Sequence, residues 1–281
     1  MLSFLISSEW LDEHRRDEHV RVVDCRFELK DAAAGHEAYV KDHIPGAVFI
    51  DVEKHLSAQA GTHGGRHPLP DMDFFAQVLS ERGIDMQTTV VAYDDQGGMG
   101  AARFWWLMQY AGHTNTYVLD RSYSHWVEEG LPTTEEIPTP LMKQMIIDRE
   151  PNQLVHLEEV KQQLRNEHVA LVDARSYERY AGENEEVDAV SGHIPGAYHY
   201  FWKDVLREDG TWKSQSELRD HFQDLEGFDE VISYCGSGIT ACVNVLGMRE
   251  AGLEQVRLYN GSWSDWISYP DLPIEKEPNR L

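Results

Sequence analysis

Short apolar runs recur along the chain and alternate with amphipathic segments. Four of these runs have the β-branched, mostly apolar character of buried strands: VRVVDC (20–25), TTVVAY (88–93), VALVDA (169–174) and DEVISY (229–234). The segments FFAQVLSERG (74–83) and LRDHFQDLEG (218–227) space their apolar positions as helices do, and each reaches a glycine, which commonly ends a helix. Strands that alternate with helices predict an α/β fold, with a mostly parallel sheet and helices on both faces.

The pattern of the first half of the chain is repeated in the second half. Three pairs of segments match in the same order, 140 to 150 residues apart: 20–29 with 169–178, 42–50 with 192–200, and 111–132 with 251–273. The segment TTEEIPTPLMKQMIIDRE (133–150) has no counterpart and contains two prolines, as linkers often do. We therefore predict two homologous domains, residues 1–132 and 151–281, joined by the linker 133–150.

The formal net charge of −24 excludes several classes of partner. Nucleic acid and anionic lipid both recruit basic surfaces, so we expect neither. No apolar run approaches the roughly 20 residues that span a bilayer, and Glu9 interrupts the N-terminal apolar patch too early for a secretory signal. The three cysteines have no paired spacing, which argues against disulfides and a zinc site and favours the reducing cytoplasm.

A glycine-rich loop follows the fourth strand run and begins with Cys235. The sequence VISYCGSGITAC (231–242) passes from a strand through CGSG into a helical pattern, and parallel α/β sheets bind ligands at the carboxyl ends of their strands. Unpaired backbone N–H groups and the helix dipole favour a thiolate there. Gly236 and Gly238 allow the backbone to curl around the sulfur. We predict a reactive thiolate in an anion-binding loop, with a buried structural cysteine as the alternative.

The other two cysteines have the pattern of small core residues. Cys25 lies in a strand run where the second copy has Ala174, and Cys242 lies inside a predicted helix. A cysteine phosphatase would need an arginine at the start of that helix, where this chain has Ala241. We therefore expect both cysteines to be buried and exclude the phosphatase class.

These residues together resemble the two-domain rhodanese superfamily of sulfurtransferases. Each copy carries a D-x-R motif and an HIPGA turn, and the second adds CGSGITA (235–241) and YNGSWSDW (259–266). The loop is similar to that of the 3-mercaptopyruvate sulfurtransferase branch, since thiosulfate-specific members typically have basic residues directly after the cysteine. The resemblance covers nearly the whole chain and implies two tandem rhodanese-like domains.

The resemblance implies a two-step transfer of sulfane sulfur through Cys235. The thiolate attacks the outer sulfur of a small anionic donor, 3-mercaptopyruvate or thiosulfate, and forms a persulfide as pyruvate or sulfite leaves. A thiophilic acceptor, such as cyanide, a small thiol or a protein thiol, then removes that sulfur. Loop N–H groups would stabilise the persulfide anion, and no metal or organic cofactor is required. Asp94 stands where Cys235 stands and cannot accept sulfur, so the first copy is expected to be scaffold.

The resemblance also assigns residues to donor binding and to catalysis. The residues expected to bind the donor are Arg179 in YERYAG and the loop residues Gly236, Gly238, Ile239 and Thr240. A relay that polarises the donor would consist of Ser237, His67 in GGRHPLP and Asp51 in VFIDVEKH. A simple surface loop at Arg66 and His67 is the alternative.

The chain departs from the family pattern at two places. No Arg or Lys occurs from 180 to 192, where the 3-mercaptopyruvate branch usually has a second arginine. Gly236 and Ser237 stand where the thiosulfate branch has basic residues. We therefore expect a site short of one positive charge. Two alternatives stay open: a thiosulfate:cyanide sulfurtransferase, and a non-catalytic module that carries persulfide or binds proteins.

Residues that recur in both copies have an architectural explanation, because only one copy carries the thiol. They are Asp24 and Asp173, Arg26 and Arg175, and His43 and His193. We expect buried ion pairs from the aspartates and arginines, and a structural role for the histidines that open the HIPGA turns.

Overall fold

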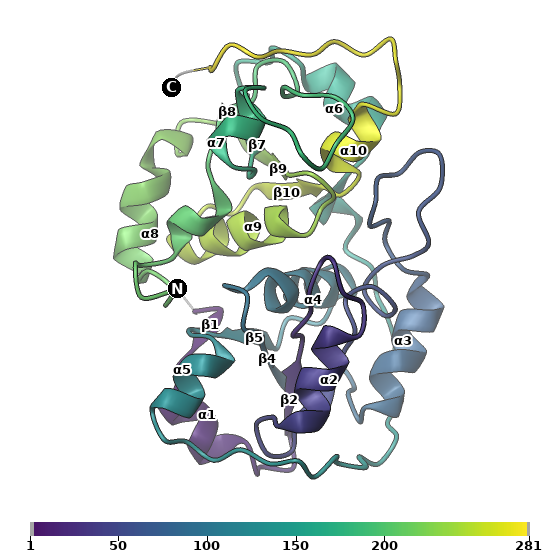
Figure 1. Ribbon diagram of the computed structural model, residues 1–281, viewed down its shortest axis with the longest axis vertical. Helices are drawn as coiled ribbons and strands as arrows, with labels where there is room; N and C mark the ends of the chain where they lie inside the picture. The colour runs from purple at the N-terminus through teal and green to yellow at the C-terminus, as the bar shows by residue number, and fades with distance from the viewer. Residues whose placement is uncertain (1–2, 280–281) are drawn as a thin grey trace. The chain divides into compact units, whose positions relative to one another are not determined.

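The computed structural model of the 281-residue chain describes residues 3–279, which form two compact units (Figure 1). The first unit comprises the chain up to Ala58 together with Leu69–Glu150 and Leu206–Trp212. The second comprises Gln59–Pro68, Pro151–Val205 and the chain from Lys213 onward. Each unit thus includes one short segment that the sequence places in the other repeat.

Within the described residues, the first unit contains a five-stranded parallel sheet of order β1-β5-β4-β2-β3. Its strands are β1 (Leu5–Ile6), β2 (Val20–Asp24), β3 (Val48–Phe49), β4 (Thr89–Tyr93) and β5 (Thr116–Leu119). Its helices are α1 (Ser8–His14), α2 (Ala34–Lys41), α3 (Met72–Glu81), α4 (Met99–Tyr110) and α5 (Tyr123–Glu128). Helices α1 and α5 pack on one face of the sheet, and α4, buried along nearly its whole length, packs on the other (Figure 1).

The described part of the second unit has a five-stranded parallel sheet of order β6-β10-β9-β7-β8. Its strands are β6 (Leu154–Val155), β7 (Val169–Asp173), β8 (Tyr198–His199), β9 (Glu230–Tyr234) and β10 (Val256–Tyr259). Its helices are α6 (Leu157–Gln163), α7 (Tyr177–Tyr180), α8 (Gln215–Phe222), α9 (Thr240–Ala251) and α10 (Ser262–Trp266), with 3₁₀ turns η1 (Pro151–Gln153), η2 (Trp202–Val205) and η3 (Gln223–Leu225). Helices α6 and α10 pack on one face, and α9 packs on the other (Figure 1).

The two sheets have the same topology: each position in the strand order of the first sheet is taken in the second sheet by the equivalent strand of the second repeat. The register is repeated as well: Asp24 lies opposite Tyr93, and Asp173 lies opposite Tyr234. The four apolar runs of the sequence form the central strands β2, β4, β7 and β9, which are covered on both faces. The predicted fold, two tandem α/β domains with parallel sheets, is confirmed.

A buried Asp–Arg pair follows β2 and β7. Arg26 Nη2 lies 2.7 Å from Asp24 Oδ2, and Arg175 Nη2 lies 2.6 Å from Asp173 Oδ2. Arg175 also donates to the carbonyl oxygen of Gly192 at 2.6 Å. Burial opposes ionisation of Asp173, but Arg175 beside it holds the pKa of that carboxyl below its ordinary value. Buried charges persist when they are paired and hydrogen-bonded, so these pairs are architectural as predicted.

The two histidines of the HIPGA turns are also part of the architecture. His43 Nδ1 lies 2.7 Å from the carbonyl oxygen of Tyr39, and His193 Nδ1 lies 2.7 Å from that of Tyr180. Each imidazole stacks on the tyrosine whose carbonyl it contacts, and both histidines are fully buried. They tie the first HIPGA turn to α2 and the second to α7.

Residues 135–150, all within the described chain, contain no helix or strand and belong to the first unit. The backbone N–H groups of Lys143 and Met145 donate to the carbonyl and hydroxyl oxygens of Ser80, and that of Glu150 donates to the carbonyl of Tyr110. These bonds tie the segment to α3 and α4. The linker over 133–150 and the domain limits beside it stay a prediction from the sequence repeat.

Candidate active site

Cys235 begins the loop between β9 and α9, at the carboxyl end of a central strand. Its backbone N–H donates to Ser262 Oγ at 3.1 Å, and its carbonyl oxygen accepts from the N–H of Trp263 at 2.9 Å. The next carbonyl, that of Gly236, accepts from Ser264 at 3.0 Å. The first turn of α10 therefore holds the start of the loop in place.

The loop turns back on the sulfur of Cys235. The N–H of Gly238 donates to Cys235 Sγ at 3.1 Å, and the cysteine is buried. Gly238 has a φ of +88°, and a Cβ there would collide with the carbonyl oxygen of Asn260, so a glycine is required. Ile239 is the N-cap residue of α9 and Thr240 is its first residue. The donor-binding roles of the four loop residues other than Ser237 stay predictions.

The other two cysteines lie in the core, as expected. Cys25 and Cys242 are both fully buried, and Cys242 Sγ lies 3.2 Å from the carbonyl oxygen of Gly238. Burial raises the pKa of the Cys25 thiol well above its ordinary value, and the negative charges of Asp24 and Asp94 add to that effect. Cys25 is therefore held as a neutral thiol.

The equivalent loop of the first unit surrounds a carboxylate. Asp94 is buried and accepts four backbone hydrogen bonds of 2.8 to 3.0 Å, from Gln96, Gly98, Gly100 and Ala101. Burial raises the pKa of Asp94 above its ordinary value, against the effect of those four N–H groups. The anion-binding loop of the first unit is thus filled by the chain's own side chain, which fits a scaffold.

Two arginines lie beside the residue that follows the thiol. A Cβ built on Gly236 would lie 2.9 Å from Arg66 Nη2 and 3.3 Å from Arg179 Nη2. The sequence predicted Arg179, which comes from α7. It did not predict Arg66, whose guanidinium is a second one beside Gly236. The sequence-based expectation that no second arginine is present is corrected here, whereas the expected shortage of positive charge stays a prediction.

Arg66 reaches this place because Gln59–Pro68 belongs to the second unit. Gly64 N–H donates to Asp265 Oδ1 at 2.7 Å, and Arg66 N–H donates to Ser264 Oγ at 3.1 Å. The ring of His63 stacks on Tyr269 with 4.1 Å between centroids. The position of Arg66 directly before His67 in the sequence was the one signal that could have indicated it.

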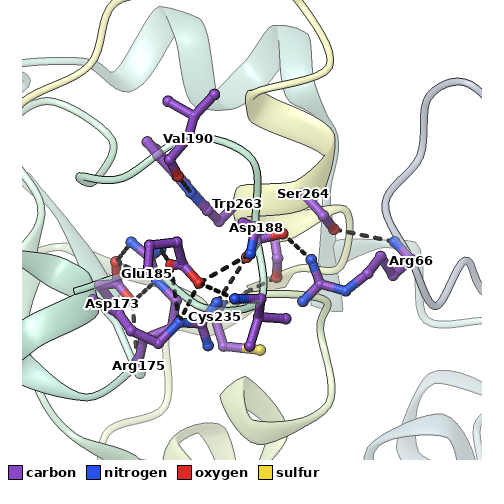
Figure 2. Close-up of polar contacts among 12 residues, drawn as sticks. Arg66, Asp173, Arg175, Glu185, Asp188, Val190, Cys235, Trp263 and Ser264 are labelled. Atoms are coloured by element: carbon purple, nitrogen blue, oxygen red, sulfur yellow. Dashed lines mark hydrogen bonds and ion pairs between the residues drawn. The ribbon is translucent and has the colours of Figure 1, made fainter. Parts of the chain in front are cut away.

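Both arginines are paired with carboxylates of the segment after α7. Arg179 donates to Glu185 at 2.9 and 3.0 Å and to Asp188 at 2.7 Å, and Arg66 forms an ion pair with the other oxygen of Asp188. Glu185 also lies 3.4 Å from Arg175, which connects this group to the pair with Asp173 (Figure 2). The inward orientation of these two acids could not be predicted from the sequence, because charged runs are usually solvated.

The pKa values of the two acids are shifted in opposite directions. Burial is the largest influence on Asp188 and raises its pKa, although Arg66 and Arg179 oppose this. Burial acts the same way on Glu185, but hydrogen bonds from Arg179 and from the backbone of Asp188 and Val187 lower its pKa overall. Glu185 is therefore the better compensated of the two carboxylates.

The proposed relay residues are placed as follows. Ser237 and His67 are both buried in the second unit. Asn260 donates to the carbonyl of His67 at 3.2 Å and lies against Gly238, the residue after Ser237. Asp51 belongs to the first unit, where its carboxylate accepts from the backbone of Glu53 and Lys54 and pairs with the Lys54 ammonium at 3.0 Å. The relay stays a prediction.

Residues 3–279 contain neither a candidate metal site nor a candidate membrane span, as follows. In this part of the chain, no group of three or more His, Cys, Asp and Glu side chains is placed to hold a metal ion. Among the same residues, no helix has the length and apolarity needed to cross a membrane.

The chain is similar in sequence and in structure to known sulfurtransferases. The sequence matches the rhodanese-like domain family over residues 7–129 and 156–269. It is 38% identical over 275 residues to a probable 3-mercaptopyruvate sulfurtransferase of Pseudomonas aeruginosa, covering 96% of this chain and 97% of that protein. It is 34% identical over 276 residues to the thiosulfate sulfurtransferase of Rattus norvegicus, covering 94% and 91% of the two chains. The crystal structure of SseA from Escherichia coli, a 3-mercaptopyruvate sulfotransferase, has a TM-score of 0.80 at 28% identity, covering 94% of this chain and 100% of that chain. With a rhodanese-like domain in each repeat, the chain belongs to the rhodanese superfamily of sulfurtransferases, near its 3-mercaptopyruvate branch.

Proposed function

We propose that this protein transfers sulfane sulfur from a small anionic donor, with 3-mercaptopyruvate favoured, to cyanide or a thiol through a persulfide on Cys235. The observation that carries the proposal is the set of polar groups around Cys235. Cys235 Sγ accepts the N–H of Gly238, and the guanidinium groups of Arg66 and Arg179 lie beside Gly236. A nucleophilic sulfur, an anion-stabilising N–H and two cations for an anionic donor are thus gathered at one strand end.

The chemistry balances without a cofactor. The Cys235 thiolate attacks the sulfur of 3-mercaptopyruvate, an S–S bond forms and the C–S bond breaks. The electron pair of the C–S bond and the thiol proton end on carbon, so pyruvate leaves and the enzyme holds a persulfide anion. Cyanide then takes the outer sulfur as thiocyanate and regenerates the thiolate. With thiosulfate the same attack releases sulfite, which needs no proton.

Ser237 and His67 would distinguish the two donors. 3-Mercaptopyruvate has a ketone whose oxygen gains negative charge as the C–S bond breaks, and a hydroxyl held by a histidine can donate to it. Thiosulfate has no such carbonyl. The role of Asp51 in orienting His67 comes from the family resemblance alone and is part of this proposal, as are the acceptor and a cytoplasmic location.

Thiocyanate formation from cyanide tests the proposal, with 3-mercaptopyruvate and thiosulfate compared side by side. Cys235→Ser should abolish turnover with either donor, whereas Cys25→Ser, a change at a buried thiol of the first unit, should keep it. A preference for 3-mercaptopyruvate that Ser237→Ala removes would support the relay. A preference for thiosulfate would favour the second candidate, a thiosulfate:cyanide sulfurtransferase. Equal background from wild type and Cys235→Ser would leave a persulfide-carrying or protein-binding module.

A further inference from the structure

The side chain of Asp188 occupies the space between the two arginines of the site. One carboxylate oxygen pairs with Arg66 and the other accepts from Arg179 at 2.7 Å. Only 3% of this side chain is exposed. Figure 2 shows Arg66 reaching Asp188 from one side, with Glu185 and Arg175 on the other. A bidentate anion between two guanidinium groups is the arrangement that a bound carboxylate or sulfonate would have.

Charges are balanced in this cluster before any donor arrives. Arg66, Arg175 and Arg179 face three carboxylates, those of Asp173, Glu185 and Asp188. An anionic donor would add an uncompensated negative charge beside three carboxylates that are almost fully buried, which is unfavourable unless one carboxylate leaves. The donor can therefore bind well only if an acid of this cluster gives up its arginines.

Asp188 is the acid that can leave at least cost. Glu185 accepts from the backbone N–H groups of Val187 and Asp188 at 2.9 and 3.0 Å, and it contacts both Arg175 and Arg179. These bonds hold it within its own turn of the chain. Asp188 is held through its two arginines, and burial raises its pKa where that of Glu185 is lowered. Its neighbours Val187 and Ala189 are exposed, so a carboxylate that releases the two arginines has solvent beside it.

We propose that Asp188 sets the charge selectivity of the Cys235 site by holding Arg66 and Arg179 in place of the donor's anionic group, so that an anionic donor binds by displacing it. This inference rests on the proposed function and explains how the anionic donor binds at the Cys235 site. Asp188 is a positioning and specificity-determining residue, since it acts through the two arginines. Neutral reagents reach the sulfur without displacing it, whereas anionic ones must compete with it.

Alkylation of Cys235 by iodoacetate and by iodoacetamide tests the charge selectivity directly. The two reagents differ by one negative charge, and mass spectrometry reports modification at Cys235 itself. Asp188→Asn should raise the ratio of the iodoacetate rate to the iodoacetamide rate about tenfold, because a like charge beside the binding site is removed. Glu186→Gln is the matched control, since it removes the same charge from an exposed residue of the same segment. An equal ratio in Asp188→Asn and Glu186→Gln would overturn the proposal.

Donor kinetics give a second readout. Asp188→Asn should lower the KM for 3-mercaptopyruvate or thiosulfate by a similar factor and leave kcat nearly unchanged, because displacement of Asp188 precedes the chemical step. A purely structural role would instead lower kcat or raise KM. If no sulfur is transferred but the alkylation ratio rises, the proposed function fails and the charge selectivity stands. If sulfur is transferred but the alkylation ratio does not change, the proposed function stands and the proposed role of Asp188 fails.

A third measurement needs no change at Asp188, in case Asp188→Asn does not fold. Hydrogen–deuterium exchange of Cys235→Ser, which cannot form a persulfide, is compared with and without thiosulfate. Displacement of Asp188 should speed exchange at the amides of residues 183–190. Slower or unchanged exchange there would contradict the proposal, since it would mean that the segment closes over the anion or takes no part in binding it.

Discussion

Asp94 and Cys235 stand at the same point of the two repeats, directly after β4 and β9, and the loop that follows donates backbone N–H groups to both. In the first unit the acceptor is a carboxylate that takes four such bonds. In the second it is a sulfur atom that accepts from Gly238. One loop is closed around an anion of its own, and the other presents an atom to which sulfur can be added.

The first prediction concerns the stability that Asp94 gives to its loop. Asp94→Ala leaves four backbone N–H groups without their acceptor, so the free energy of unfolding should fall by about 2–4 kcal/mol in urea titrations. Asp95→Ala is the matched control: Asp95 accepts at the exposed surface from Ser124, and its loss should cost less than about 1 kcal/mol. Equal losses in the two variants would show that the loop does not depend on its internal anion.

A pH dependence follows from His55. Burial first, and the positive charge of Arg82 next, lower the pKa of His55 from 6.5 to about 4. Its Nδ1 accepts the backbone N–H of Asp51 at 2.9 Å, which requires the unprotonated nitrogen. The unfolded chain takes up this proton near pH 6.5 and the folded chain only near pH 4, so acidification across that window favours unfolding.

The measurement compares wild type with His55→Asn in urea at several pH values between 7 and 4. The asparagine oxygen can accept from Asp51 but does not titrate, so the variant should lose less stability than wild type as the pH falls. His113, His193 and His221 also have lowered pKa values and the same sign, but they contribute equally to both proteins. If the stabilities of wild type and His55→Asn fall in parallel with pH, His55 is not the source of the pH dependence.

The sheets could be predicted because local pattern and tertiary environment agree there. The run VRVVDC is mostly apolar, with valines at three of its first four positions, which suits a strand covered on both faces. Its repeat as VALVDA marked a second copy of the same element. The Asp24–Arg26 and Asp173–Arg175 pairs were identified as structural because they occur in both repeats, although only the second repeat carries the reactive thiol. Cys235 was marked by its flanking glycines, of which Gly238 has the positive φ that a side chain would disfavour.

Arg66 and Asp188 could not be predicted in the same way, because their positions depend on contacts distant in sequence. Arg66 lies in the first repeat of the sequence and in the second unit of the structure, 122 residues from the acid with which it pairs. Asp188 belongs to the acidic run ENEEVD, and such runs are normally solvated. Nothing local distinguishes the inward-facing Asp188 from the exposed Glu186 two residues earlier.

Arg66 should contribute to donor affinity. Arg66→Met is expected to raise the KM for an anionic donor roughly 10- to 100-fold, since a hydrogen bond to a charged group contributes about 1.5–3 kcal/mol. Arg66→Lys should restore part of the loss, because it keeps the charge without the fork of donors. Arg16→Met, at an exposed position, removes the same charge from the molecule as a whole and should leave KM unchanged. Matching KM values for Arg66→Met and Arg16→Met would place Arg66 outside the donor site.

The last prediction concerns the contribution of the Cys235 loop, as distinct from the rest of the fold, to the rate of sulfur transfer. Gly238→Ala puts a Cβ at a φ of +88°, against the carbonyl oxygen of Asn260 and 2.8 Å from its Oδ1. The loop must shift, and the N–H of residue 238 then moves away from Cys235 Sγ. Because removal of one preorganised donor from a developing anion typically costs 10²–10³ in rate, we expect kcat for thiocyanate formation to fall by roughly that factor.

Gly227→Ala is the control for Gly238→Ala, since a Cβ at Gly227 meets no atom within 4 Å and its φ is ordinary. That variant should keep wild-type kcat. If Gly238→Ala folds normally and kcat is unchanged, the N–H at 3.1 Å is a packing contact, and the stabilisation of the persulfide must come from Arg66 and Arg179 instead.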